Sequence, residues 1–427
     1  MFGLNKHLVV LSFICFFGLS CQYKKSTTKV NQSSPTAAQL LGHPDFLAMS
    51  YGGYRQTTRD IQPTSEEIKD DLRLMYAIGV RMIRTYNLQL AQASNILKAI
   101  KELRQTSSDF EMYVMLGAWI DCKNAWTELP PDHNVEDFEN NTSEIAKAVE
   151  LANTYPEIVK IISVGNEAMV HWATPYFVQP SVILKWVNHL QNLKQNQRLP
   201  KDLWITSSDN FASWGGGSED YHNKDLDALI SAVDYISIHT YPFHDTHYNA
   251  QFWDTPHSER NFGIDQRINS AMKRAVDYAI SQYKQVESYV ERLGVEKPIH
   301  IGETGWATTS QGLYGLNGSF AADEYKQALY YSGIRQWSNE NGVACFFFEA
   351  FDEPWKDANH SNGSENHFGL FTVDGKAKFA LWSEVDKGSF TGLGRNNSPV
   401  DKTNNGNRED LMKLVFPPKI KLTPQIN

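Results

Sequence analysis

Eight short apolar runs alternate with helical patterns along most of this chain, and no other feature constrains the fold as strongly. Strands that alternate with helices build a parallel sheet, and eight such units predict a single (β/α)8 TIM barrel of the α/β class. An open, doubly wound sheet is the alternative. The barrel is favoured because no glycine-rich phosphate loop follows the first run and polar residues recur where several runs end. The runs cover residues 46–51, 80–86, 112–120, 158–164, 203–207, 233–239, 298–302 and 343–349.

Helix start and stop signals lie between these runs. Thr64 and Glu67 have the spacing of a capping box, in which each side chain bonds the backbone N–H of the other residue. Gly79 follows at the place where that helix would end. Further helices are expected from residue 181 onward, over residues 265–293 and over residues 323–341.

The N-terminus has the pattern of an export signal. Lys6 precedes an apolar run over residues 8–19, which is too short for a comfortable membrane span. The run closes just before Cys21, and a cysteine directly after a small residue resembles a bacterial lipoprotein cleavage site, although Gly18 stands where such sites usually carry leucine. We therefore expect an exported protein with a lipid on Cys21, placed at the outer membrane or cell surface, whose contact with the membrane is limited to that anchor.

The composition along the chain predicts four segments. They are a signal peptide over residues 1–21, a flexible polar tether over 22–43, the barrel over 44–390 and an asparagine-rich tail over 391–427 that packs on the surface or is disordered.

The two cysteines beyond the leader, Cys122 and Cys345, lie far apart in the sequence. They match neither a disulfide framework nor a metal-ligand spacing, so two separate thiols are expected.

Charge and composition narrow the choice of partner. The formal net charge of −9, with no basic block, argues against nucleic acid and favours an uncharged substrate. The 11 Trp and 19 Tyr residues offer faces that stack on sugar rings, although a large barrel also buries many aromatic side chains. His239, His244 and His247 cluster in sequence but match no zinc motif. We expect a monomer that uses no metal and no cofactor.

Three of the apolar runs deliver a glutamate at their C-terminal ends, and two of these are Glu167 after the fourth run and Glu303 after the seventh. A lone glutamate there would ordinarily only end a strand or begin a loop. In a barrel, however, these ends lie across the mouth from each other, at a carboxyl separation of roughly 5 Å that suits a retaining glycosidase. The pair predicts Glu303 as the nucleophile and Glu167 as the acid and then the base.

The other strand ends predict a polar and aromatic rim, which is where barrel enzymes bind their substrates. Asn166 is expected to bind the sugar 2-hydroxyl, Tyr241 to hydrogen-bond Glu303 and keep it ionised, and Trp306 to form a platform under the sugar. Salt-bridge networks are the alternative explanation for the charged members. The remaining predicted substrate-binding residues are Tyr51, Arg84, Tyr86, Trp119, Trp172, Asn210, His239, Glu349, Glu353 and Lys356.

Several of these segments closely resemble glycoside hydrolase family 17, the β-1,3-glucanase family. The resemblance implies a retaining (β/α)8 barrel with the acid on strand four and the nucleophile on strand seven, and it implies supporting roles for Glu353, Lys356 and Glu365. Aromatic insertions after strands four and six depart from the plant enzymes, so the subsites are expected to differ. The matching segments are residues 84–86, 163–167, 241–243, 301–306, 346–356 and 367–371.

Three functions are consistent with these residues. The first is hydrolysis of β-1,3-glucan such as laminarin, and the second is transfer of a glycosyl unit to another glucan, since water and sugar compete for the same intermediate. The third is a surface lipoprotein that binds glycans without cleaving them. It is disfavoured because a pure binder needs the aromatic residues but not Glu167, Glu303 and Lys356. Endo and exo action both remain open.

Overall fold

The computed structural model describes residues 34–420, and they contain a closed barrel of parallel strands with the neighbour order β1-β10-β9-β8-β7-β6-β3-β2. This confirms the predicted (β/α)8 class and all eight predicted strands. The predicted signal peptide and Cys21 lie outside the described residues. The barrel strands are β1 (Leu47–Ser50), β2 (Val80–Arg84), β3 (Tyr113–Ala118), β6 (Val159–Asn166), β7 (Trp204–Asn210), β8 (Ile236–His239), β9 (Ile299–Gly305) and β10 (Cys345–Phe348).

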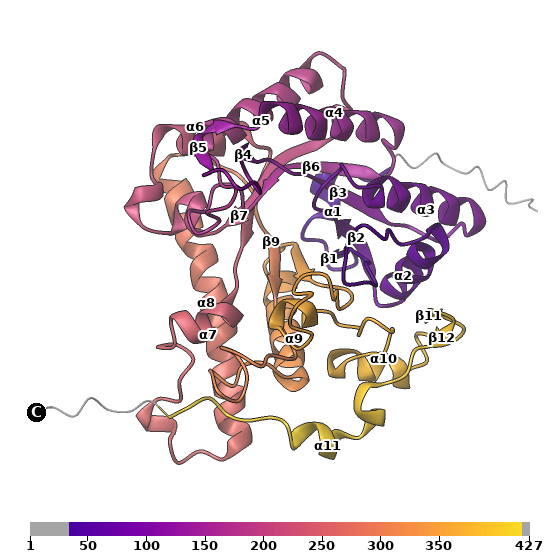
Figure 1. Cartoon of the computed structure of the whole chain (residues 1–427), viewed down its shortest axis with the longest axis vertical. Helices are drawn as coiled ribbons and strands as arrows, with labels where there is room; N and C mark the ends of the chain where they lie inside the picture. The colour runs from indigo at the N-terminus through magenta and orange to yellow at the C-terminus, as the bar shows by residue number, and fades with distance from the viewer. Residues whose placement is uncertain (1–33, 421–427) are drawn as a thin grey trace, which may run out of the picture. The chain divides into compact units, whose positions relative to one another are not determined.

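The helices that connect the strands lie around the barrel (Figure 1). The capping box is present at the start of the first connecting helix, where Thr64 N–H donates to Glu67 Oε2 at 2.7 Å and Glu67 N–H donates to Thr64 Oγ1 at 3.3 Å. All four predicted helices are confirmed. The connecting helices are α2 (Ser65–Ala77), α3 (Gln92–Thr106), α4 (Phe138–Thr154), α5 (Pro180–Gln195), α6 (Lys224–Ala232), α8 (Ile264–Arg292) and α9 (Glu324–Glu340).

A short helix, α1 (Ala37–Leu40), precedes the first strand and belongs to the barrel core. Ala37 and Leu40 are buried in one apolar cluster with barrel residues that include Met115 and Phe346. The end of the predicted tether therefore differs from the expectation, because Ala37, Leu40 and Leu41 gain free energy by leaving water. No helix within residues 34–420 combines the length and the apolar character that crossing a membrane requires.

Insertions that the sequence did not predict follow several strands. After β3 the chain forms an antiparallel pair, β4 (Cys122–Lys123) and β5 (Asp132–Glu136), and after β8 it forms α7 (Pro242–Tyr248). Both described cysteines, Cys122 and Cys345, are free and buried, as expected. Short turns of 3-10 or π helix cover Ala212–Gly216, Glu219–Tyr221, His257–Glu259, Ser364–His367, Phe379–Leu381 and Thr403–Gly406.

The segment after the barrel packs against it through a buried arginine. This segment contains α10 (Trp382–Asp386), the antiparallel pair β11 (Gly394–Arg395) and β12 (Ser398–Pro399), and α11 (Arg408–Met412). Arg395 is fully buried and donates to both carboxylate oxygens of Asp71 on α2, from Nε at 2.8 Å and from Nη2 at 3.1 Å. The β11–β12 pair accordingly lies beside α2 (Figure 1).

Candidate active site

Glu167 and Glu303 lie at the C-terminal ends of β6 and β9, and β7 and β8 separate these strands in the barrel. Both carboxyl groups are largely shielded from water, with 15% and 9% of their side-chain surface exposed. Glu167 has a φ of 47°, in the left-handed region, and its N–H donates to Ser208 O at 3.0 Å. The chain therefore turns at Glu167 while remaining tied to β7.

Arg84, at the end of β2, joins the two strand ends. Its Nη1 donates to Glu303 Oε2 and to Gly302 O, both at 2.8 Å, and its Nη2 donates to Asn166 Oδ1 at 2.6 Å. The guanidinium is 1% exposed. Because a guanidinium is always charged and presents its donors in a rigid fork, Arg84 keeps a positive charge against Glu303 and orients the neighbouring amide.

Two tyrosines complete the set of donors to Glu303. Tyr241 Oη donates to Oε1 at 2.6 Å, as predicted, and Tyr86 Oη donates to Oε2 at 2.8 Å. Burial, and then the charge of Glu303, raise the pKa of each tyrosine well above its ordinary value, so both remain protonated. Burial alone would raise the pKa of Glu303, but the electrostatic interactions with His239 and Arg84 and these two hydrogen bonds outweigh it and lower that pKa.

His239, at the end of β8, connects the two glutamates through Arg84. Its Nδ1 lies 3.0 Å from Glu167 Oε1, and its Nε2 lies 3.0 Å from Arg84 Nη1 and 2.8 Å from Ser208 Oγ. Burial lowers the pKa of His239 to about 4, so the ring is neutral near pH 7 and the lasting positive charge beside Glu303 is that of Arg84. Arg84 can only donate, so Nε2 accepts and Nδ1–H donates to Glu167 Oε1.

The two carboxyl groups therefore differ in protonation at neutral pH. Burial, and then the negative charge of Glu303, raise the pKa of Glu167 to about 8, whereas the pKa of Glu303 is lowered. Since His239 occupies Oε1 of Glu167, the proton of that acid belongs on Oε2. One protonated and one ionised carboxyl group in one site is the arrangement that acid-assisted displacement requires.

A second charged group follows β10. Lys356 Nζ lies 3.8 Å from Glu349 Oε2 and 3.6 Å from Glu353 Oε2. Glu353 is otherwise satisfied, since its Oε1 accepts from Tyr54 N–H at 3.0 Å and its Oε2 accepts from Trp355 Nε1 at 2.9 Å. Within residues 34–420, Glu349 Oε1 is buried without a hydrogen-bond partner, and burial raises the pKa of Glu349 well above its ordinary value. Glu349 therefore keeps capacity for a further hydrogen bond.

Two predicted substrate-binding residues have structural partners instead. Trp306 is fully buried, donates from Nε1 to Ala321 O at 2.8 Å and therefore offers no face to a sugar. Tyr51 is 1% exposed and donates to Asp71 Oδ2 at 3.0 Å. Asn210 stays a prediction: it is half-buried, and its Oδ1 accepts from Ala212 N–H at 3.0 Å. The turn that follows each strand decides which way the next side chain points, and the strand pattern does not record that turn.

The aromatic predictions Trp119 and Trp172 both lie in loops that follow barrel strands. Trp119 is half-buried and donates from Nε1 to Asp121 Oδ1 at 2.6 Å, whereas 60% of Trp172 is exposed.

The sequence did not predict the role of Glu144 on α4. Its buried carboxylate accepts from the N–H groups of Leu88, Gln89 and Trp119, and so holds the loops after β2 and β3 together. A single glutamate in a helical pattern gives no signal of this role.

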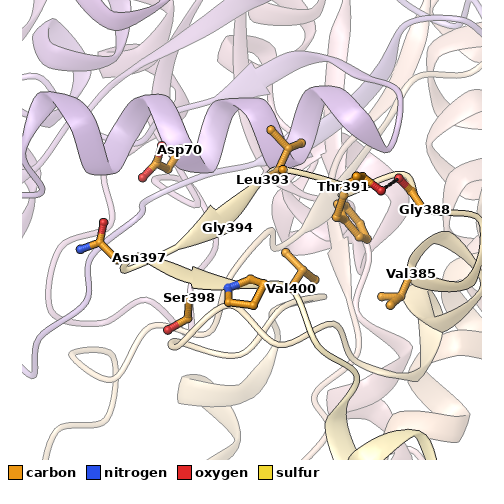
Figure 2. A pocket seen from close by; sticks show the side chains of 12 residues that line it. Asp70, Val385, Gly388, Thr391, Leu393, Gly394, Asn397, Ser398 and Val400 are labelled. Carbon is orange, nitrogen blue, oxygen red and sulfur yellow. Dashed lines mark hydrogen bonds between the residues drawn. The ribbon is translucent and has the colours of Figure 1, made fainter.

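A separate hollow of about 490 Å³ lies between α2 and the β11–β12 pair (Figure 2). None of the predicted site residues lines it, and Asp70 is the only charged side chain among the residues that do. It therefore lacks the paired carboxyl groups that glycosidic cleavage requires.

Comparisons with known proteins agree on the class of enzyme. Residues 48–369 match the family model described as the BtgE/BtgC glycoside hydrolase domain. An endo-laminarinase from Formosa Hel1_33_131 is 60% identical and superposes with a TM-score of 0.90, over 92% of this chain and 100% of that one. A glucan 1,3-beta-glucosidase from Arthroderma benhamiae is 26% identical over 314 residues, which are 71% of this chain and 81% of that protein.

A more distant structure supports the fold alone. The glycoside hydrolase family 17 beta-1,3-glucanosyltransferase from Rhizomucor miehei is 19% identical and has a TM-score of 0.55, over 79% of this chain and 96% of that one.

Proposed function

The chain belongs to the family of BtgE/BtgC glycoside hydrolase domains, and on this premise we propose that it hydrolyses β-1,3-glucan of the laminarin type with retention of anomeric configuration. The substrate follows from the 60% identical relative, whose name is endo-laminarinase. In this proposal Glu303 is the nucleophile and Glu167 is the acid and then the base.

One observation carries the proposal. A chain of hydrogen bonds runs from Glu167 through His239 and Arg84 to Glu303, and it joins a carboxyl group with a raised pKa to one with a lowered pKa. A structural salt-bridge network would hold both groups ionised and paired. Here Glu303 accepts from the charged Arg84 and from both tyrosines, which favours its ionised form, whereas the printed donor to Glu167 is the neutral ring of His239.

In the first step, Glu303 attacks the anomeric carbon and Glu167 gives its proton to the glycosidic oxygen. The bond between that oxygen and the anomeric carbon breaks, and the leaving chain departs with a new hydroxyl group. Glu303 then no longer carries the negative charge that helps to raise the pKa of Glu167. The pKa of Glu167 falls as a result, and Glu167 becomes the base for the next step.

In the second step, Glu167 takes a proton from water, whose oxygen attacks the anomeric carbon and releases Glu303. Asn166 supports both steps, because Arg84 occupies its Oδ1 and leaves the amide N–H₂ to donate to the sugar 2-hydroxyl. Glu349 Oε1 is buried without a partner among the described residues, so Glu349 has capacity for a further hydrogen bond to the sugar.

The test is to incubate the purified chain with laminarin and with a defined β-1,3-glucan oligosaccharide, and to resolve the products over time. We expect products shorter than the starting oligosaccharide, with the anomer first released in the configuration of the substrate. Products longer than the starting oligosaccharide would establish transglycosylation in place of simple hydrolysis. An absence of turnover would favour a glycan-binding protein.

We further propose that the protein is exported and anchored by a lipid on Cys21. The anchor would hold the enzyme at the cell surface or outer membrane, where it can reach a polysaccharide substrate. The apolar run over residues 8–19 and the small residue before Cys21 support this proposal. Labelling with radioactive palmitate, after expression of the full chain in a bacterium, tests it. We expect Cys21→Ser to remove the label and Cys15→Ser, in the same leader, to keep it. Equal labelling of both variants would contradict the anchor.

A further inference from the structure

We propose that Trp126 is the outer surface of an additional glucan subsite, built with Trp119 and Tyr176 beside Glu167, and that it binds sugar units of the leaving chain. This inference rests on the proposed function and extends it to the length of substrate that the enzyme recognises. Trp126 lies between β4 and β5, and 61% of it is exposed.

Trp126 rests on a layer of aromatic rings. It is stacked on Tyr176, with ring centroids 5.1 Å apart and planes inclined by 22°. Trp119 packs against Tyr176 at 5.1 Å and against Trp126 at 6.4 Å. Tyr176 covers one face of Trp126, so the exposed surface belongs to the rest of the indole. The apolar C–H face of a glucose ring can pack on such a surface.

Asp121 fixes the orientation of both indoles. Its Oδ1 accepts from Trp119 Nε1 at 2.6 Å and from Trp126 Nε1 at 3.2 Å. Trp126 also has a φ of 60°, a left-handed conformation that costs a bulky residue free energy. An exposed side chain held by a buried carboxylate, on strained backbone, is prepared to bind before the ligand arrives.

This aromatic layer is tied to the loop that follows Glu167. Tyr176 lies in the loop that follows Glu167, and Cys122 N–H donates to Tyr176 O at 3.1 Å, which joins that loop to the loop carrying Trp126. Tyr176 is 8% exposed, so the neighbouring rings and loops cover most of it. Burial, and then the charges of Glu167 and Asp209, raise the pKa of Tyr176, which agrees with its place beside the acid.

The order of the barrel strands decides which half of the substrate meets this layer. The layer follows β3 and β6, and these are neighbours on the Glu167 side of the site. Glu349 and Lys356 follow β10, which neighbours β9 on the Glu303 side. Glu167 protonates the oxygen of the leaving chain, so sugar units on its side are those that leave, or those that arrive as acceptors.

The test compares two substrates in steady-state kinetics of the full chain. One is laminarin, and the other is an aryl β-laminaribioside, which has no sugar beyond the scissile bond. For Trp126→Ala we expect the ratio of kcat/KM for laminarin to kcat/KM for the aryl glycoside to fall about tenfold, mostly through KM. Trp126→Phe keeps an aromatic ring but loses the indole N–H that bonds Asp121, so we expect a smaller fall in this ratio.

Leu414→Ala serves as the matched control, because Leu414 is 65% exposed and follows α11, far from β4 and β5 (Figure 1). We expect it to leave the ratio unchanged. An unchanged ratio in Trp126→Ala would overturn the subsite, and so would an equal loss on both substrates, which would indicate a structural role. If the wild-type chain cleaves the aryl glycoside but not laminarin, the subsite proposal fails while the catalytic pair stands. If it cleaves neither, the proposed function fails as well.

Discussion

Two clusters of buried charge, one around Asp71 and one around Glu303, differ in how completely their hydrogen bonds are satisfied. Around Asp71, the carboxylate accepts from Tyr51, Arg55 and Arg395, and both of its oxygens are occupied. Around Glu303, the carboxylate is equally well held, but Glu349 Oε1 has no partner among the described residues and Glu167 has a pKa of about 8.

The difference separates a structural use of buried charge from a chemical one. The Asp71 cluster joins α2, the loop after β1 and the segment after the barrel, and both oxygens of its carboxylate already accept hydrogen bonds from protein donors. The catalytic cluster keeps one carboxyl group protonated and another unpaired, at a cost in stability. Removing charges from each cluster should therefore affect different properties of the protein.

The largest effect is expected for Glu303→Ala. Without the nucleophile no glycosyl-enzyme forms, so kcat should fall by more than about 10⁴-fold while the protein stays folded. Azide should restore turnover of an aryl glycoside and give the azide product of inverted configuration, because a small anion fills the vacated space and attacks once. Hydrolysis of laminarin by the variant at the wild-type rate would remove Glu303 from this role.

Glu167→Gln should have the next largest effect. It keeps the size of the side chain but cannot give a proton, so hydrolysis of laminarin should slow by about 10²- to 10⁴-fold. An aryl glycoside with an acidic leaving group needs less help, so the first step on that substrate should be slowed much less. Burst kinetics measure the two steps separately, and equal slowing of the first step on both substrates would argue against Glu167 as the acid.

Asp71→Ala should affect stability more than chemistry. It leaves the guanidinium of Arg395 buried without its carboxylate, which costs about 3–5 kcal/mol in the free energy of unfolding. Its neighbour Asp70, paired on the surface with Arg73, is the matched control, and Asp70→Ala should cost less than about 1 kcal/mol. Urea unfolding measures both. A similar loss in the free energy of unfolding for both variants would contradict a structural role for the Asp71 cluster.

The pH dependence of kcat/KM should show the smallest effect, but it reports directly on the protonation of the two glutamates. Glu167 acts as an acid only while it is protonated, and its pKa is about 8, so activity should fall about tenfold per unit above that pH. Glu303 must be ionised, and its lowered pKa keeps it ionised until the pH falls below the ordinary pKa of glutamate. For an aryl glycoside, Glu167→Gln should lose the alkaline fall. Its persistence would assign that fall to another group.

Much of the fold and the central pair followed from local patterns. The apolar runs, the capping box at Thr64 and the glutamates after the fourth and seventh runs depend on neighbours within a few residues, and these patterns predicted the strands, the helices and the candidate pair. The eight-unit alternation then implied the barrel, because few other arrangements bury so many parallel strands.

The direction of individual side chains was decided only by the tertiary structure. Trp306 and Tyr51 follow strands as Tyr86 and Tyr241 do, yet the first two point into the core and the last two reach Glu303. Sequence distance also hid Arg395, which meets Asp71 across 324 positions.

The sequence by itself determined which residues end the strands, and therefore which carboxyl groups stand at the mouth of the barrel. Only the tertiary structure decided their unequal protonation, because the pKa of Glu167 and that of Glu303 depend on burial and on Arg84, His239 and each other. These groups come from four different strands, and closure of the barrel is what brings their charges within a few ångströms.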